Sequence, residues 1–186
     1  VLTERDGLKE ATKAEVLLRS GVLSGWLGSA SQIGGAQERA KDLISESARL
    51  FEALGDTERA AEARIDLSTC YWREGAFDEA RVTLREVLVQ LEHSQGELKL
   101  RALLNSASVE TACARYQDAL RIHLQAAPLF ETSDNNTLKG KFHNEFAVVF
   151  KNLGVAEHRE DYIDRALMEY TAAGYHWEQA GDTRFC

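Results

Sequence analysis

The chain has 186 residues, of which 44% are hydrophobic and 28% charged, and its formal net charge is −8. This composition is typical of a folded globular protein and excludes a disordered chain. No apolar run approaches the roughly 20 residues of a membrane-spanning helix, and the first residues do not form a signal segment. The acidic balance disfavours nucleic-acid binding, which depends on Lys and Arg neutralising phosphates. We therefore expect a cytoplasmic protein with no direct nucleic-acid partner and no membrane partner.

The first third of the chain predicts long amphipathic helices. With one Pro in the whole chain, helix is favoured throughout and no sheet is expected. Residues 1–34 form either one long helix or two, because Gly21, Gly25 and Gly28 mark either close helix packing or a break. Residues 36–54 form the next helix. Gly55 supplies a left-handed residue after that helix, and Asp56 or Thr57 caps the helix that follows.

Residues 57–92 predict two amphipathic helices joined by a tight turn at Gly75. Apolar and small residues recur here at steps of three and four, which is the helical period. Ala80 and the small residues that align with it, Ala40, Ala119 and Ala166, recur at about 40-residue intervals, with an insertion at 155–161 before the last. That insertion is either a longer helix or a polar loop. The spacing divides the chain into about four to four and a half repeats, at 1–55, 56–96, 97–136 and 137–182.

The pattern resembles the tetratricopeptide repeat (TPR), in which W-x2-L-G-x2-Y is followed by A-x3-F and then P. The matching residues are Leu67-Ser68-x2-Tyr71 and Ala80-x3-Leu84, with Arg64 in the place of Trp. In the third repeat, Glu110 stands in the place of Tyr and His123 in the place of Phe. The period near 40 resembles the longer repeats of bacterial regulators and scaffold proteins. The resemblance implies an all-α fold, a right-handed α-α superhelical solenoid of antiparallel helix hairpins.

The resemblance also implies a concave surface that binds a peptide or a partner helix, lined by the first helix of each repeat. Carried onto this sequence, the residues lining it are Glu62, Ile65, Thr69, Trp72, Arg73, Arg101, Leu104, Asn105, Ser108, Thr111, Lys141, Asn144, Glu145, Val148, Lys151 and Asn152. Bases outnumber acids in this set, which favours an acidic or carboxylate-bearing peptide. Two alternatives stay open: the bases pair with acids on adjacent helices, or Trp72 packs against the neighbouring repeat.

No enzyme motif for nucleotide binding, acyl transfer or metal-dependent hydrolysis occurs. The five histidines share no metal-ligand spacing, so we expect no metal, no cofactor and no catalytic activity. Cys70, Cys113 and Cys186 are too widely spaced for a metal site, and the first two are read as small buried residues.

We therefore expect a non-catalytic protein-interaction scaffold. The alternative is a ligand-sensing or self-assembly module of a larger regulatory protein, because the chain lacks an initiating Met and residues 182–186 resemble the start of a further helix. An uncovered last repeat would expose apolar surface. End-to-end association is accordingly predicted around Trp177, Ala180 and Phe185.

Overall fold

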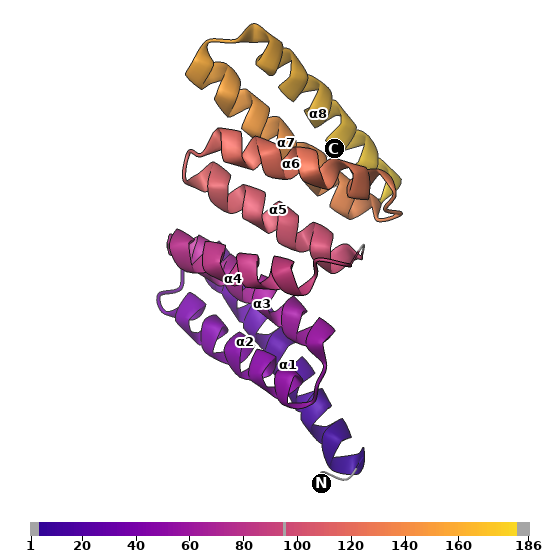
Figure 1. Ribbon diagram of the computed structural model, residues 1–186. Coiled ribbons are helices and arrows are strands. Elements are labelled where there is room, and N and C mark those ends of the chain that lie inside the picture. The colour runs from indigo at the N-terminus through magenta and orange to yellow at the C-terminus, as the bar shows by residue number, and fades with distance from the viewer. Residues whose placement is uncertain (1–3, 95, 182–186) are drawn as a thin grey trace. The chain divides into compact units, whose positions relative to one another are not determined.

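The computed structural model describes residues 4–94 and 96–181, with side chains from Lys9 onward (Figure 1). Within these ranges the chain is helical and contains no strand, so the predicted all-α class is confirmed for them. None of the described helices is long and apolar enough to cross a membrane. The helices are α1 (Glu4–Ala30), α2 (Ala36–Ala53), α3 (Thr57–Glu74), α4 (Phe77–Gln90), α5 (Glu97–Ala112), α6 (Tyr116–Glu131), α7 (Asn136–Glu157) and α8 (Glu160–Gln179).

The chain divides into two compact units, Val1–Glu92 and His93–Cys186, which we call the N-terminal and C-terminal units. Each unit holds four helices, so each of the four predicted repeat segments contains one pair. The predicted helix start at 182–186, together with Phe185, lies outside the described residues.

The turn between α2 and α3 forms as its residue types predict. Gly55 has a φ of 74°, a left-handed conformation that costs a glycine nothing because it has no Cβ. The side chain of Asp56 accepts a hydrogen bond from the backbone N–H of Arg59 at 3.0 Å. This satisfies one of the free N–H groups at the start of α3 and confirms Asp56 as the cap.

The glycines of α1 mark close packing and not a break, because α1 is one continuous helix. A Cβ added at Gly21 would lie 2.7 Å from Cγ1 of Ile44, and one added at Gly28 would lie 2.1 Å from Cβ of Ala36. Only glycine lets the backbones of α1 and α2 approach this closely. Around this contact lies the core of the N-terminal unit, formed by Ala14, Leu18, Ala40, Ile44, Ala48, Leu50, Phe51, Ala60, Ala63 and Cys70.

The small residues used to align the repeats are buried. The exposed fraction is 0% for Ala40, Ala80 and Ala119, and 3% for Ala166. Their predicted burial is confirmed, and we use the alignment of these four residues to compare the units.

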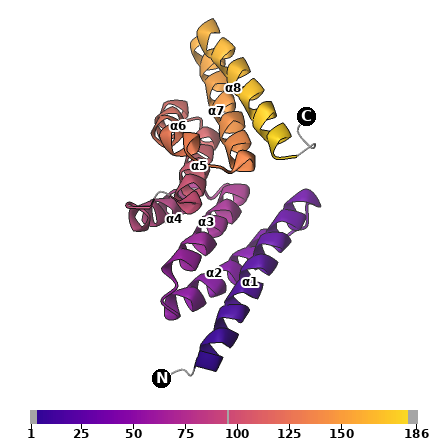
Figure 2. The same cartoon turned by 90° about the vertical axis from the view of Figure 1, so that its right-hand side faces the viewer.

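In the C-terminal unit, α7 packs against α5, α6 and α8. It continues to Glu157, so the insertion predicted at 155–161 is mostly a longer first helix. Pro128 lies inside α6, which continues to Glu131. α7 lies between α6 and α8 (Figure 2).

Candidate functional site

In the N-terminal unit, the predicted peptide-binding residues have different environments. Ile65 is fully buried, so its side chain belongs to the core and offers no surface to a ligand. Thr69 is half-buried and its hydroxyl donates to the carbonyl of Ile65 at 3.4 Å. Trp72 is 40% exposed and Arg73 is half-buried. Trp72 and Arg73 are therefore the two predicted residues at the end of α3 that can meet a ligand.

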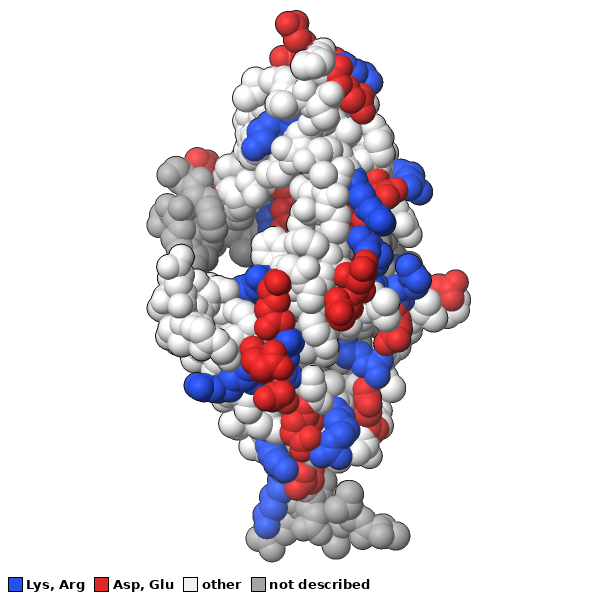
Figure 3. Space-filling model, turned by 90° about the vertical axis from the view of Figure 1, so that its left-hand side faces the viewer, with Lys and Arg blue, Asp and Glu red and all other residues white. Residues whose placement is uncertain are grey.

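Glu62 is buried and paired with bases of its own unit. It lies 3.0 Å from Nη1 of Arg19 on α1 and also pairs with Arg59, which in turn pairs with Glu15. Acidic and basic side chains are interspersed over the molecular face shown in Figure 3. For Glu62, the alternative of ion pairing with an adjacent helix is therefore the one that the structure shows, because Arg19 lies on α1.

In the C-terminal unit, one predicted residue of α5 contacts one of α7. The Ser108 hydroxyl on α5 donates a hydrogen bond to the Glu145 carboxylate on α7. Lys141 and Lys151 are exposed, and Nζ of Lys141 lies 3.8 Å from Glu145. Burial raises the pKa of Glu145, while Lys141 and Ser108 act in the opposite direction.

The other predicted residues of this unit complete that surface, with one correction. Leu104 is 1% exposed and belongs to the core, so it cannot contact a ligand. The half-buried residues beside it are Arg101, Asn105, Ser108, Thr111, Asn144, Val148 and Asn152. We call Arg101, Asn105, Ser108, Lys141, Asn144, Val148 and Lys151 the α5–α7 surface.

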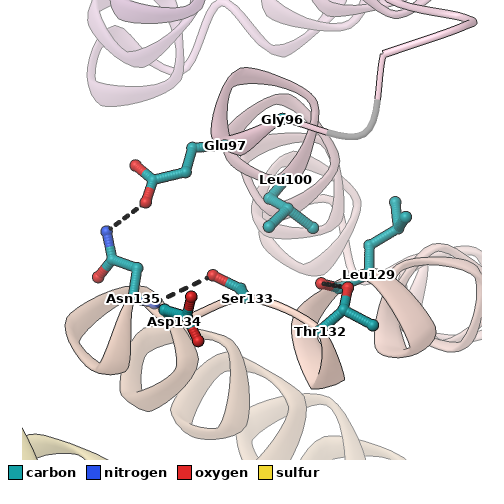
Figure 4. Close-up of a pocket in the computed structure, with 8 residues that line it drawn as sticks. All are labelled: Gly96, Glu97, Leu100, Leu129, Thr132, Ser133, Asp134 and Asn135. Atoms are coloured by element: carbon teal, nitrogen blue, oxygen red, sulfur yellow. Dashed lines mark hydrogen bonds between the residues drawn. The ribbon is translucent and has the colours of Figure 1, made fainter.

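A polar pocket of about 500 Å³ lies at the loop between α6 and α7 (Figure 4). Asn135 caps α7 by accepting from the N–H of Leu138 at 3.0 Å, and its amide donates to Glu97 at 2.9 Å. The N–H of Asn135 donates to the Ser133 hydroxyl at 3.2 Å. These groups hold the loop and the start of α7 in place, which is a structural role.

A second cavity, of about 310 Å³, lies between α6, α7 and α8, and we call it the histidine cleft. α6 and α8 both pack on α7, and side chains of all three helices line the cavity. Its lining residues are Ala127, Phe130, Glu131, Lys139, Phe142, His143, Phe146, Arg165, Glu169 and His176.

The floor of the histidine cleft is a layer of aromatic rings. The rings of Phe130 and Phe142 stack at 4.3 Å between centroids, and Phe142 and Phe146 are 5.5 Å apart. His123 of α6 stacks on Phe146 at 4.9 Å and meets Phe142 edge-on at 5.3 Å. Burial lowers the pKa of His123 to about 4, so the ring is neutral at physiological pH.

The polar side of the histidine cleft is built around Glu169. Its Oε2 lies 2.7 Å from Nδ1 of His143, and its Oε1 accepts from Nε and Nη2 of Arg165, both at 2.9 Å. Burial acts to raise the pKa of Glu169, but His143 and Arg165 outweigh it and the net shift is downward. The ionised carboxylate can only accept, so Nδ1 of His143 carries the proton.

His176 completes the lining from the last turns of α8. Its ring lies parallel to that of His143 at 5.3 Å, and its Nδ1 donates to Oδ1 of Asn136 at 3.0 Å. Burial lowers the pKa of His176, and the charges of His143 and Lys139 lower it further. A carboxylate-oriented imidazole is also how enzymes hold a general base.

Sequence reasoning missed this cluster because its members are far apart along the chain. His143 and Glu169 are on different helices, and neither belongs to a recognised motif. The one sequence signal was His123, which stands where the repeat pattern has Phe. Among the described residues no group of three or more His, Cys, Asp or Glu side chains forms a metal site.

No protein-family model matches the sequence. Comparison with curated proteins also gives no match. Among solved structures, the chain is similar to the crystal structure of BtubC (BKLC) from P. vanneervenii, with a TM-score of 0.62 and 16% sequence identity. The match covers 98% of this chain and 85% of that chain. At this identity the likeness concerns the fold alone, and it shows that another protein has a similar helical arrangement.

Proposed function

We propose that the chain is a right-handed solenoid of TPR-like helix hairpins. Two features support this. The four aligned small residues are all buried within hairpins. Within each unit the first helix of one hairpin also contacts the first helix of the next, as α1 does with α3 and α5 with α7. Hairpins stacked in this way place their first helices along one surface.

The proposed function is non-catalytic binding of an acidic or carboxylate-bearing peptide on the α5–α7 surface. One observation carries it: α5 and α7 are joined by the Ser108–Glu145 hydrogen bond, and Nζ of the exposed Lys141 lies 3.8 Å from the same Glu145 carboxylate. The net charge of −8 does not oppose this, because salt screens charges beyond roughly 8 to 10 Å. The proposed setting is the cytoplasm, where the free thiols of Cys70 and Cys113 stay reduced.

A peptide-display selection against the whole chain tests this function. Acidic sequences should be enriched, and their affinity should fall as salt is raised. The double variant Arg101→Glu/Lys141→Glu should abolish binding while its circular dichroism and melting temperature stay unchanged. Lys13→Glu/Arg121→Glu is the matched control, because it makes the same charge change at exposed positions outside the α5–α7 surface. Equal affinity of the two double variants at low salt would refute the assignment.

A second candidate function is a ligand-sensing regulatory module. The histidine cleft favours it, because an enclosed aromatic floor with converging polar groups is typical of small-ligand sites. Self-assembly has less support. Trp177 is half-buried and lies against Gly140, where an added Cβ would be 2.5 Å from the indole ring. Ala180 is exposed.

A further inference from the structure

We propose that the histidine cleft binds a small aromatic carboxylate, one ring bearing one acid group. The inference rests on the second candidate function and names its ligand class. It is independent of the α5–α7 surface, because the helical period places Lys141 and Val148 about 140 to 160° around α7 from His143.

The size of the cleft and its aromatic floor favour a ligand with a single ring. A volume of about 310 Å³ is at the lower end of small-ligand pockets and is too small for a helix. Phe130, Phe142 and Phe146 line the cleft but are each at most 4% exposed, so a ligand ring would touch only a small part of each ring. An aromatic group entering between α6 and α8 would extend this layer of rings.

The cationic groups at the cleft have unused capacity. Lys139 donates only to the backbone carbonyl of Glu131, at 3.3 Å, and forms no ion pair with a described carboxylate. Arg165 engages Glu169 through Nε and Nη2, and its Nη1 bonds to no described residue. Arg165 is also half exposed, so its free edge can meet an entering carboxylate. A guanidinium edge and an ammonium suit this group because both form charge-assisted hydrogen bonds with it.

The acids at the cleft do not cancel this preference. Glu169 already accepts from both His143 and Arg165, so its charge is compensated. Glu131 is exposed to solvent, which screens it. The remaining titratable groups are His176, whose pKa is lowered, and the neutral His123. A bound carboxylate would stabilise the protonated form of His176, so binding should strengthen as the pH falls.

The N-terminal unit does not have rings at all of the positions that carry them around the cleft. Aligning Ala40 with Ala119 pairs Ile44 with His123, and aligning Leu67 with Phe146 pairs Ala63 with Phe142. At these two positions the N-terminal unit has aliphatic residues, while Phe51 stands at the position of Phe130. His123 is not among the residues that line the cleft; it is 1% exposed, and its Nε2 has no hydrogen-bond partner among the described residues. A buried imidazole in this state costs stability, so this position is not optimised for packing alone.

Titration of the whole chain with 3-phenylpropionate tests the proposal, followed by NMR of the Phe and His rings. We expect a Kd on the order of 1 mM for a ligand of this size, with shifts at Phe142, Phe146 and His143. The neutral 3-phenylpropionamide tests the need for the charge, and butyrate tests the need for the ring. Both should bind about tenfold more weakly or worse. Equal affinity for the acid and the amide would overturn the proposal, as would the absence of shifts at these rings.

Two variants locate the site. Ala127→Leu should block the cleft, and Arg165→Gln should weaken binding about tenfold by removing the free guanidinium edge. Arg121→Gln is the matched control, because this exposed arginine of α6 lies outside the cleft. If Ala127→Leu folds and still binds with unchanged affinity, the ligand does not occupy the cleft.

Two further probes distinguish the sources of the ligand. A peptide ending in Phe with a free carboxylate represents a protein C-terminus, and its C-terminal amide is the control. Tighter binding of the free peptide than of 3-phenylpropionate supports a C-terminal residue as ligand. Binding of 3-phenylpropionate without binding of the peptide supports a free metabolite. Neither binding would refute the site. This test can fail while the peptide-display test succeeds, because none of the residues that line the histidine cleft belongs to the α5–α7 surface.

Discussion

The two units fill the same place between their helices with different chemistry. In the N-terminal unit, Ile44 and Phe51 of α2 meet small and aliphatic residues of α3, and Ile44 is 0% exposed. At the equivalent positions of the C-terminal unit, His123 and Phe130 of α6 meet Phe142 of α7. One hairpin scaffold thus accepts either an aliphatic residue or an aromatic ring at the position of Ile44 and His123, while it keeps a Phe at the position of Phe51 and Phe130.

A hydrogen bond between the end of the last helix and the start of the helix before it occurs in both units, although different residues form it. Gln90 of α4 donates to the carbonyl of Thr57 at 2.8 Å, and the equivalent His176 of α8 donates to Asn136 at 3.0 Å. The position of Glu169 is occupied by Thr83 in the N-terminal unit, where no carboxylate can orient an imidazole. The comparison shows that small residues and contacts at the helix ends hold the helices in place. The residues that fill the space between the helices can therefore differ between the two units.

Exchanging the residues at the paired core position should show the largest effect. Ile44→His places an imidazole in an aliphatic core with no partner and should lower the free energy of unfolding by about 3 kcal/mol. The reverse change, His123→Leu, removes an unpaired polar group and should cost less than about 1 kcal/mol or stabilise the protein. Urea denaturation at pH 7 measures both. Similar losses for the two variants would show that the units are not equivalent at this position.

The pH dependence of stability should come from the C-terminal unit. The pKa of His123 is about 4 in the folded protein, against 6.5 in the unfolded chain. Between these values the unfolded chain binds more protons, so stability falls as the pH is lowered through this window. The expected loss at pH 5 is about 2 kcal/mol relative to pH 7. Comparing wild type with His123→Leu isolates this contribution, which the variant should lack.

The helical frame follows from the sequence, because its causes are local. The spacing of apolar residues predicted the helices. Gly55 and Asp56 predicted a turn whose conformation only a few residue types adopt. The alignment on Ala40, Ala80, Ala119 and Ala166 identified buried positions, because only small residues fit between packed helices. Whether Gly21 and Gly28 break α1 or allow close packing depends on Ile44 and Ala36 of another helix, so α1 alone left both readings open.

The candidate sites were less predictable, because burial depends on neighbouring helices. Ile65 and Leu104 follow the pattern of a ligand-facing position but are covered in the folded chain. The histidine cleft is lined by residues of α6, α7 and α8, and no property of one helix sequence alone reports how the three helices meet.

Replacing a helical glycine by alanine should change the stability of the protein in a direction that depends on the atoms around the new Cβ. Gly21→Ala should destabilise the N-terminal unit by about 1 to 2 kcal/mol, because the new Cβ would lie 2.7 Å from Ile44 and 3.1 Å from the carbonyl oxygen of Ala40. Gly174 of α8 has nothing within 4 Å of an added Cβ. Gly174→Ala should therefore stabilise the protein by up to about 1 kcal/mol through helix propensity alone. Thermal melts of the two variants shifting in the same direction would contradict the close packing of α1 on α2.

The smallest effects should come from the two capped first helices, which compare the units directly. Asp56 caps α3 and Asn135 caps α7, each accepting from the N–H three residues later at 3.0 Å. Replacing either by Ala should cost about 1 kcal/mol, since one N–H at the helix start then loses its partner. Asn135→Ala should cost slightly more, because Asn135 also donates to Glu97 and so links the starts of α5 and α7. The double variant Asn135→Ala/Glu97→Ala measures that extra part. If Asn135→Ala still costs more than Asp56→Ala when Glu97 is already Ala, the link to α5 is not the cause of the difference.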